Sequence, residues 1–170
     1  MTHMTFYINA FTSNLETFEK LLNKIDKEQL AWKQDPRKWS LIEVICHLYD
    51  EEREDFRARL KVVLETPDKP FTAINPQGWV TERNYALQNF ENMLQMFIQE
   101  RKNSIDWLRS LDSHGWDNIH IHPKLGRMSA KLILANWLAH DYLHIRQITK
   151  LKYDYLKNLS NENLSYAGDW

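Results

Sequence analysis

Two histidines four residues apart, His140 and His144, lie in the apolar, periodic segment 129–152. In an α-helix this spacing places both imidazoles on one face. At about 100° per residue, the same face carries four apolar side chains, Ile133, Trp137, Ile148 and Leu151. The two rings are therefore predicted to face inward. Burying an unpaired polar group costs about 1 to 3 kcal/mol, so the pair needs hydrogen-bond partners or a cation.

Apolar residues at helical spacing predict four amphipathic helices, which cover approximately residues 6–30, 40–65, 82–111 and 129–152. The second helix begins at a capping box, in which the carboxylate of Glu43 can reach back to the amide of Ser40. Ser129 is the expected N-cap of the fourth helix. The polar tail, residues 153–170, is predicted to be a short helix followed by a frayed end.

The connections between these helices contain most of the proline and glycine. Residues 66–81 hold three of the 5 Pro and form a long crossing loop. Residues 112–128 form a second loop, with a short extended piece expected at 118–122. The fold class is therefore all-α, a four-helix bundle with long connections between helices 2 and 3 and between helices 3 and 4. With 170 residues, we expect one domain over 1–170.

Composition and charge exclude several classes of function. The net charge of −1 and the pI of about 6.7 give no basic field for a phosphate backbone, which argues against nucleic-acid binding. The single cysteine, Cys46, excludes an internal disulfide and a thiolate-rich zinc site. Neither a signal peptide nor an apolar stretch long enough to span a bilayer is found, so we expect a soluble, cytoplasmic protein without membrane contact.

The spacing of His140 and His144 allows one helix to offer two nitrogens to a single metal ion. A tetrahedral catalytic site uses about three protein ligands. His47 is the candidate third ligand, because it is the other histidine on a predicted helix and its position beside the apolar face suits a cleft. The glutamate that follows the first histidine in zinc proteases is missing, and Asp141 lies about 100° from the histidine face. The zinc-protease mechanism therefore does not transfer.

Other interpretations of the polar residues stay open. The paired histidines can be core or interface residues bonded to carbonyls, and His47 can be a surface residue. A competing triad lies in the last connection, formed by His114, His120 and His122. Glu51, one turn after His47, can be a hydrogen-bond acceptor for a ligand, a fourth ligand or a solvated carboxylate.

Cysteine and tryptophan are interpreted mainly as packing residues. Cys46 points about 100° away from His47, which is poor geometry for a catalytic dyad, so a small buried apolar residue is expected. Four tryptophans could wall a pocket, although packing is the simpler role: Trp39, Trp79, Trp116 and Trp137.

Several short motifs follow one another along the chain. They are Trp39-Ser40 followed by EVICHLYDEE, then RNY at 83–85, HPKLGRMS at 122–129 and LAHDYLHIRQI at 138–148. In this order they resemble the DinB/YfiT-like superfamily of metal-binding four-helix bundles, over an expected core of residues 5–152. In that family one histidine of helix two and the histidine pair of helix four hold a metal. The resemblance therefore implies His47, His140 and His144 as metal ligands here.

The resemblance implies an activity only in broad terms. Family members include thiol-dependent S-transferases and isomerases that use bacillithiol, mycothiol or glutathione, and many relatives described as metal-dependent hydrolases. Many of them form dimers. We therefore hypothesise a homodimeric enzyme of hydrolase or thiol S-transferase type that acts on a small molecule.

Three neutral imidazoles would leave a divalent cation its full charge, which favours lowering the pKa of a bound water or thiol. Zinc or nickel suits imidazole ligation, and a low-molecular-weight thiol is a second candidate cofactor. The alternative is a non-catalytic dimeric bundle that binds the metal structurally. The sequence names no catalytic residue beyond the metal ligands and no substrate.

Overall fold

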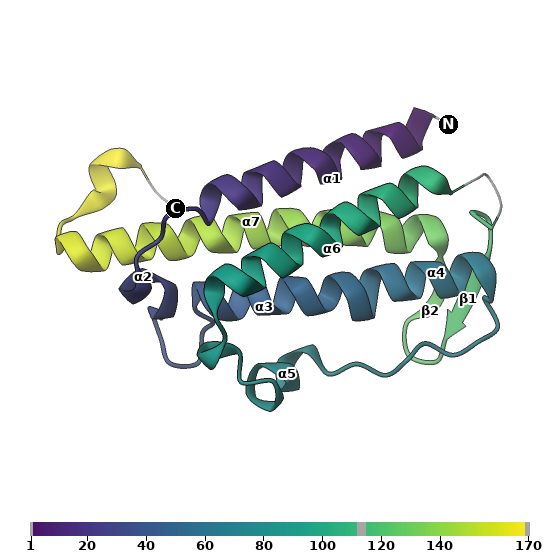
Figure 1. Cartoon of the computed structure of the whole chain (residues 1–170), viewed down its shortest axis with the longest axis horizontal. Coiled ribbons are helices and arrows are strands. Elements are labelled where there is room, and N and C mark those ends of the chain that lie inside the picture. The colour runs from purple at the N-terminus through teal and green to yellow at the C-terminus, as the bar shows by residue number, and fades with distance from the viewer. Residues whose placement is uncertain (1, 112–114, 169–170) are drawn as a thin grey trace.

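The computed structural model describes residues 2–111 and 115–168 (Figure 1). Its long helices are α1 (Thr2–Leu21), α6 (Phe90–Ser110), α7 (Ala130–Ser160) and a continuous helix made of α3 (Leu41–Asp50), the π-helical segment η1 (Glu51–Phe56) and α4 (Arg57–Glu65). The shorter elements are α2 (Lys27–Ala31), α5 (Pro76–Glu82), the 3-10 turns η2 (Tyr85–Leu87) and η3 (Leu164–Ala167), and two strands, β1 (Ile119–His122) and β2 (Gly126–Ser129). The predicted all-α four-helix bundle is confirmed.

The four long helices run along the longest dimension of the molecule (Figure 1). α1 packs mainly against α6 and α7, and the α3–α4 helix packs against the same two helices. Aromatic residues fill part of the core between these helices. The ring centroids of Phe18 of α1 and Phe97 of α6, for example, lie 5.4 Å apart. This arrangement makes α3 and α7 direct neighbours, although a large part of the chain separates them.

The predicted starts of helices two and four are confirmed. The backbone amide of Ser40 donates to Glu43 Oε2 at 2.7 Å, which is the expected capping-box contact. Ser129 Oγ accepts from the amide of Leu132 at 3.1 Å and so caps α7. Local capping hydrogen bonds therefore set the starts of both long helices that carry the candidate histidines.

Three predicted helix boundaries were wrong, and left-handed residues lie near two of them, the ends of the first and fourth helices. The predicted helix 6–30 ends at Leu21, because Lys24 has a φ of +52°, and α2 follows separately. The third helix begins only at Phe90, where the side chain of Asn89 accepts from the amide of Asn92 at 2.8 Å and caps the first turn. The fourth helix continues through the predicted tail to Ser160 and ends at left-handed Asn161. Backbone of this kind is sampled by non-glycine residues too rarely for a periodicity argument to predict it.

The extended piece expected at 118–122 is β1, and it pairs antiparallel with β2, which was not predicted. This hairpin holds the long loop that follows α4. The ring of Phe71 stacks on His120 at 4.0 Å, and His120 Nδ1 donates to the carbonyl of Pro67 at 2.8 Å. Across the described residues, no helix combines the length and apolar character needed to cross a membrane.

Candidate metal centre

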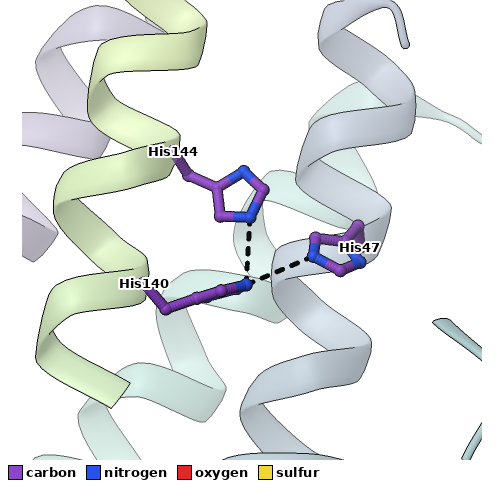
Figure 2. A group of neighbouring side chains, drawn as sticks. All are labelled: His47, His140 and His144. Atoms are coloured by element: carbon purple, nitrogen blue, oxygen red, sulfur yellow. Dashed lines mark hydrogen bonds between the residues drawn. The ribbon is translucent and has the colours of Figure 1, made fainter. Parts of the chain in front are cut away.

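Three histidine rings from two neighbouring helices meet at one point between α3 and α7 (Figure 2). His140 Nε2 lies 3.3 Å from His47 Nε2 and 3.0 Å from His144 Nε2. The nitrogens that could act as ligands all lie within 4.8 Å of one another. The structure therefore brings together all three residues that the sequence singled out.

The alternative interpretation of His47 as a surface residue was wrong. Its side chain is 5% exposed, because α7 covers the flank of α3 from which it projects. A helical-wheel argument places a residue relative to its own helix, but the neighbouring helix decides which flank is covered. His144 is also buried, at 8% exposure, and His140 is partly buried.

Burial keeps all three imidazoles neutral. Desolvation, with the nearby His144, lowers the pKa of His47 to about 3. Desolvation lowers the pKa of His140 to about 2, with further contributions from the charges of His144, His47 and Arg101. The pKa of His144 falls to about 4, again because of burial, although its bond to Gln147 opposes the shift. Neutral imidazole is the form that binds a metal ion.

A hydrogen bond to Gln147 fixes the tautomer of His144. His144 Nδ1 lies 2.7 Å from Gln147 Oε1. A carbonyl oxygen can only accept, so Nδ1 carries the hydrogen and Nε2 keeps its lone pair, which faces His140. An acceptor on the far nitrogen of this kind is typical of metal-binding histidines.

The donor set fits a divalent cation. With Zn–N bonds of about 2.0 to 2.1 Å, tetrahedral geometry puts ligand nitrogens about 3.3 Å apart, close to the two separations between the histidine nitrogens. When all three rings are neutral, Nε2 of His140 faces the Nε2 atoms of both other histidines, and it can donate a hydrogen to at most one of them. A cation would accept the lone pairs of all three rings.

Aromatic side chains enclose the three histidines. The ring of Trp39 lies 4.7 Å from the ring of His47, and the ring of Phe56 lies 4.9 Å from that of His140. Trp39 therefore lines the site, as one of the four tryptophans proposed for a pocket wall, whereas Trp137 packs in the core at 1% exposure. Apolar walls lower the local dielectric and strengthen electrostatic interactions inside the site.

Glu51 does not join the three histidines. Among the described residues, the group of potential ligands around this point consists of the three histidines. Glu51 is 5% exposed, and burial, followed by the charge and hydrogen bond of Asp55, raises its pKa to about 8. Asp55 is paired with Arg59 at 2.6 Å, so the proton of this acid pair resides on Glu51. The interpretation of Glu51 as a solvated carboxylate was wrong.

The competing histidines of the last connection serve the hairpin and the loop. His120 is bonded to Pro67, as described above, and His122 Nδ1 accepts from the amides of Lys124 and Leu125, both at 3.1 Å. His114 lies outside the described residues. Within the described chain, neither His120 nor His122 belongs to a group of potential metal ligands.

Cys46 is a buried thiol, as predicted. It is fully buried, and desolvation, with the charges of Asp50 and Glu43, raises its pKa to about 12. A thiol with such a pKa is not a nucleophile at neutral pH. The structure therefore gives no role in catalysis to this residue.

A buried ionic network beside the histidines was missed by the sequence reasoning. Arg101 of α6 is 1% exposed and forms paired hydrogen bonds of 2.9 and 2.8 Å to Glu52, and of 2.5 and 2.8 Å to Asp141. The indole of Trp137 donates to Glu52 at 2.9 Å, and Asn14 donates to Asp141 at 3.1 Å. The available signal was an arginine inside the apolar stripe of the third helix, which indicates a buried counter-charge.

Comparisons with known proteins bear on the family and the fold. The family model of the DinB superfamily matches residues 10–148. Among solved structures, YfiT from Bacillus subtilis, described as a probable metal-dependent hydrolase with an unusual four-helix bundle topology, superposes with a TM-score of 0.79. It shares 16% sequence identity, and the match covers 89% of this chain and 87% of that chain. At this identity the likeness shows the fold. No curated protein matches the chain.

Proposed function

The chain belongs to the DinB superfamily, and from this premise we propose that it is a divalent-metal-dependent enzyme of hydrolase or thiol S-transferase type. The proposed ligands are His47, His140 and His144. The observation that carries the proposal is the convergence of three neutral Nε2 atoms from two helices, at separations of 3.0 and 3.3 Å. Zinc or nickel would suit these ligands.

The number of ligands favours catalysis over a structural role. A structural zinc site is usually closed by four protein ligands, whereas a catalytic site keeps one position open. Among the described residues the group has three members. A bound divalent cation would supply Lewis acidity and would lower the pKa of a water or thiol at its open position.

Other side chains around the three histidines support this proposed site. Gln147 holds the lone pair of His144 toward the other two rings. Trp39 and Phe56 keep bulk water away from His47 and His140. Glu51 retains a proton at neutral pH one helical turn from His47 and is our candidate for proton transfer.

Metal analysis tests the ligand assignment. Protein purified without a polyhistidine tag should bind about one equivalent of Zn²⁺ or Ni²⁺, and His47→Ala and His144→Ala should each weaken binding at least about 100-fold. His122→Ala is the matched control, because His122 lies in the hairpin outside the group, and it should bind like wild type. Equal binding by wild type and the two site variants would refute the assignment.

Turnover separates the enzyme from the non-catalytic alternative. The metal-loaded protein should hydrolyse an activated ester or transfer a low-molecular-weight thiol to an electrophile, and His47→Ala should abolish either reaction. A chain that unfolds when the metal is removed, with neither reaction detected, would favour a structural metal site. Omitting the low-molecular-weight thiol from the same assay tests whether the reaction requires it as a cofactor.

A homodimer is part of the proposal. It is supported by exposed apolar side chains on α7, where Tyr142 is 51% and Leu143 is 54% exposed, next to the turn that carries His144. Such side chains are common at interfaces between subunits. Sedimentation of the protein at micromolar concentration tests this point directly.

A further inference from the structure

The ionic network between α3–α4, α6 and α7 has an unbalanced charge. Arg101 contributes one positive charge, and Glu52 and Asp141 contribute two negative charges. All three side chains are at most 2% exposed. In the described part of the chain, no other charged side chain is paired with either carboxylate. The network therefore carries one excess negative charge inside the protein, where an uncompensated charge is costly.

This excess charge lies next to the three histidines. Asp141 directly follows His140 on α7, and the indole bonded to Glu52, that of Trp137, belongs to the preceding turn. The ring of Trp137 stacks at 6.1 Å on Phe56, which contacts His140. Arg101 with one carboxylate would form a neutral pair, so the second carboxylate is the source of the excess negative charge.

We propose that the buried network of Arg101, Glu52 and Asp141 is the counter-charge for a divalent cation held by His47, His140 and His144. This inference rests on the proposed function, because it concerns the same metal site. Three neutral imidazoles give the cation no charge compensation, and in an apolar environment a nearby negative charge stabilises it strongly. The ligands supply lone pairs, and the network supplies the charge.

Charge-neutral variants with the same shape test the proposal. Glu52→Gln and Asp141→Asn each remove the excess charge and leave Arg101 paired with the other carboxylate. Both should weaken Co²⁺ binding about 10- to 100-fold in a chelator competition. Azide should bind the Co²⁺-loaded variants about 10-fold more tightly than the loaded wild type, because the site then carries more positive charge. The visible spectrum of Co²⁺ reports both equilibria.

Two control variants distinguish charge from simple loosening of the site. Glu54→Gln removes the same charge from the same π-helical segment, but Glu54 is about one-third exposed and is paired with Arg83, so its Co²⁺ affinity should stay within about threefold. Ile105→Val removes a buried methyl group from the core side of α6 without changing charge, and it should also stay within about threefold. A loosened site would weaken metal and azide binding together.

The affinities of the variants for Co²⁺ and azide decide whether the network acts as the counter-charge. Weaker Co²⁺ and tighter azide binding in either network variant that folds, with both controls near wild type, supports the proposal. Wild-type affinities in the network variants, or an equal loss in Glu54→Gln, would overturn the counter-charge and leave the metal site intact. A wild-type protein that binds no Co²⁺, Zn²⁺ or Ni²⁺ would overturn the proposed function itself.

Discussion

Gln147 shows how a single side chain prepares a ligand. Its Oε1 accepts the hydrogen of His144 Nδ1 at 2.7 Å, and it lies one turn beyond His144 on α7. The bond holds the ring in one orientation and in the tautomer whose Nε2 has a lone pair. The free-energy cost of ordering the Gln147 side chain is small, because this side chain is only partly buried and the helix already restricts its orientation.

Removing this acceptor should weaken metal binding without unfolding the protein. Gln147→Ala should reduce Zn²⁺ affinity about 10-fold, because His144 then loses its fixed tautomer and orientation. Chelator competition measures the change. Gln99→Ala is the control, since Gln99 is exposed on α6 and bonds only to Asn103 in the described contacts. Equal affinities for Gln147→Ala and Gln99→Ala would show that the bond does not support the ligand.

At the scale of elements, the helix α3–η1–α4 carries most of the polar groups around the site. The π-helical segment adds a residue to the helix and so changes which side chains share a face. Within it Glu51 and Asp55 form a proton-sharing pair, while Glu52 pairs with Arg101 of α6. The adjacent acids Glu51 and Glu52 thus have different partners.

The start of this helix should be sensitive to its cap. Ser40→Ala should lower the free energy of unfolding by about 1 kcal/mol, because Ser40 Oγ no longer bonds to Glu43 and the first turn loses its capping box. Urea denaturation measures the difference. Ser13→Ala is the matched control at an exposed position inside α1, where alanine should be neutral or slightly stabilising. An unchanged midpoint for Ser40→Ala would contradict this account of the cap.

At the scale of the whole molecule, the buried titratable groups set how stability depends on pH. The histidines have native pKa values of about 3, 2 and 4, below the ordinary value of 6.5, so the unfolded chain binds more protons between about pH 4 and 6.5. The free energy of unfolding therefore rises with pH over that range, by at most about 1.4 kcal/mol per pH unit for each histidine.

Glu51 acts in the opposite direction. Its native pKa of about 8 lies above the ordinary 4.5, so the folded protein binds more protons between these values and stability falls as pH rises. Three histidines outweigh one glutamate below about pH 6.5, and of these four groups only Glu51 contributes between about pH 6.5 and 8. The metal-free protein should therefore be most stable near pH 6.5, as measured by urea denaturation at a series of pH values. Glu51→Gln should remove the decline above pH 6.5, and a decline that persists would exclude Glu51 as its cause.

The sequence by itself determined the parts that depend on local geometry. Helical periodicity predicted the four long helices, the capping box at Ser40, and the shared face of His140 and His144, because each follows from the turn of a single helix. The position of His47 on a predicted helix made it the candidate third ligand, and the resemblance carried by the motif order implied the same residue. Left-handed Lys24 and Asn161 lie where helices ended without any periodic signal to mark the end.

Only the tertiary structure decided which helices are neighbours. His47 and His140 are 93 positions apart, and their contact exists because α3 packs against α7. The same packing buried Arg101 between Glu52 and Asp141, whereas the sequence showed only an arginine interrupting an apolar stripe. Periodicity fixes which side of a helix is apolar, but the partner across that side, and the charge it contributes, depends on how separate helices pack.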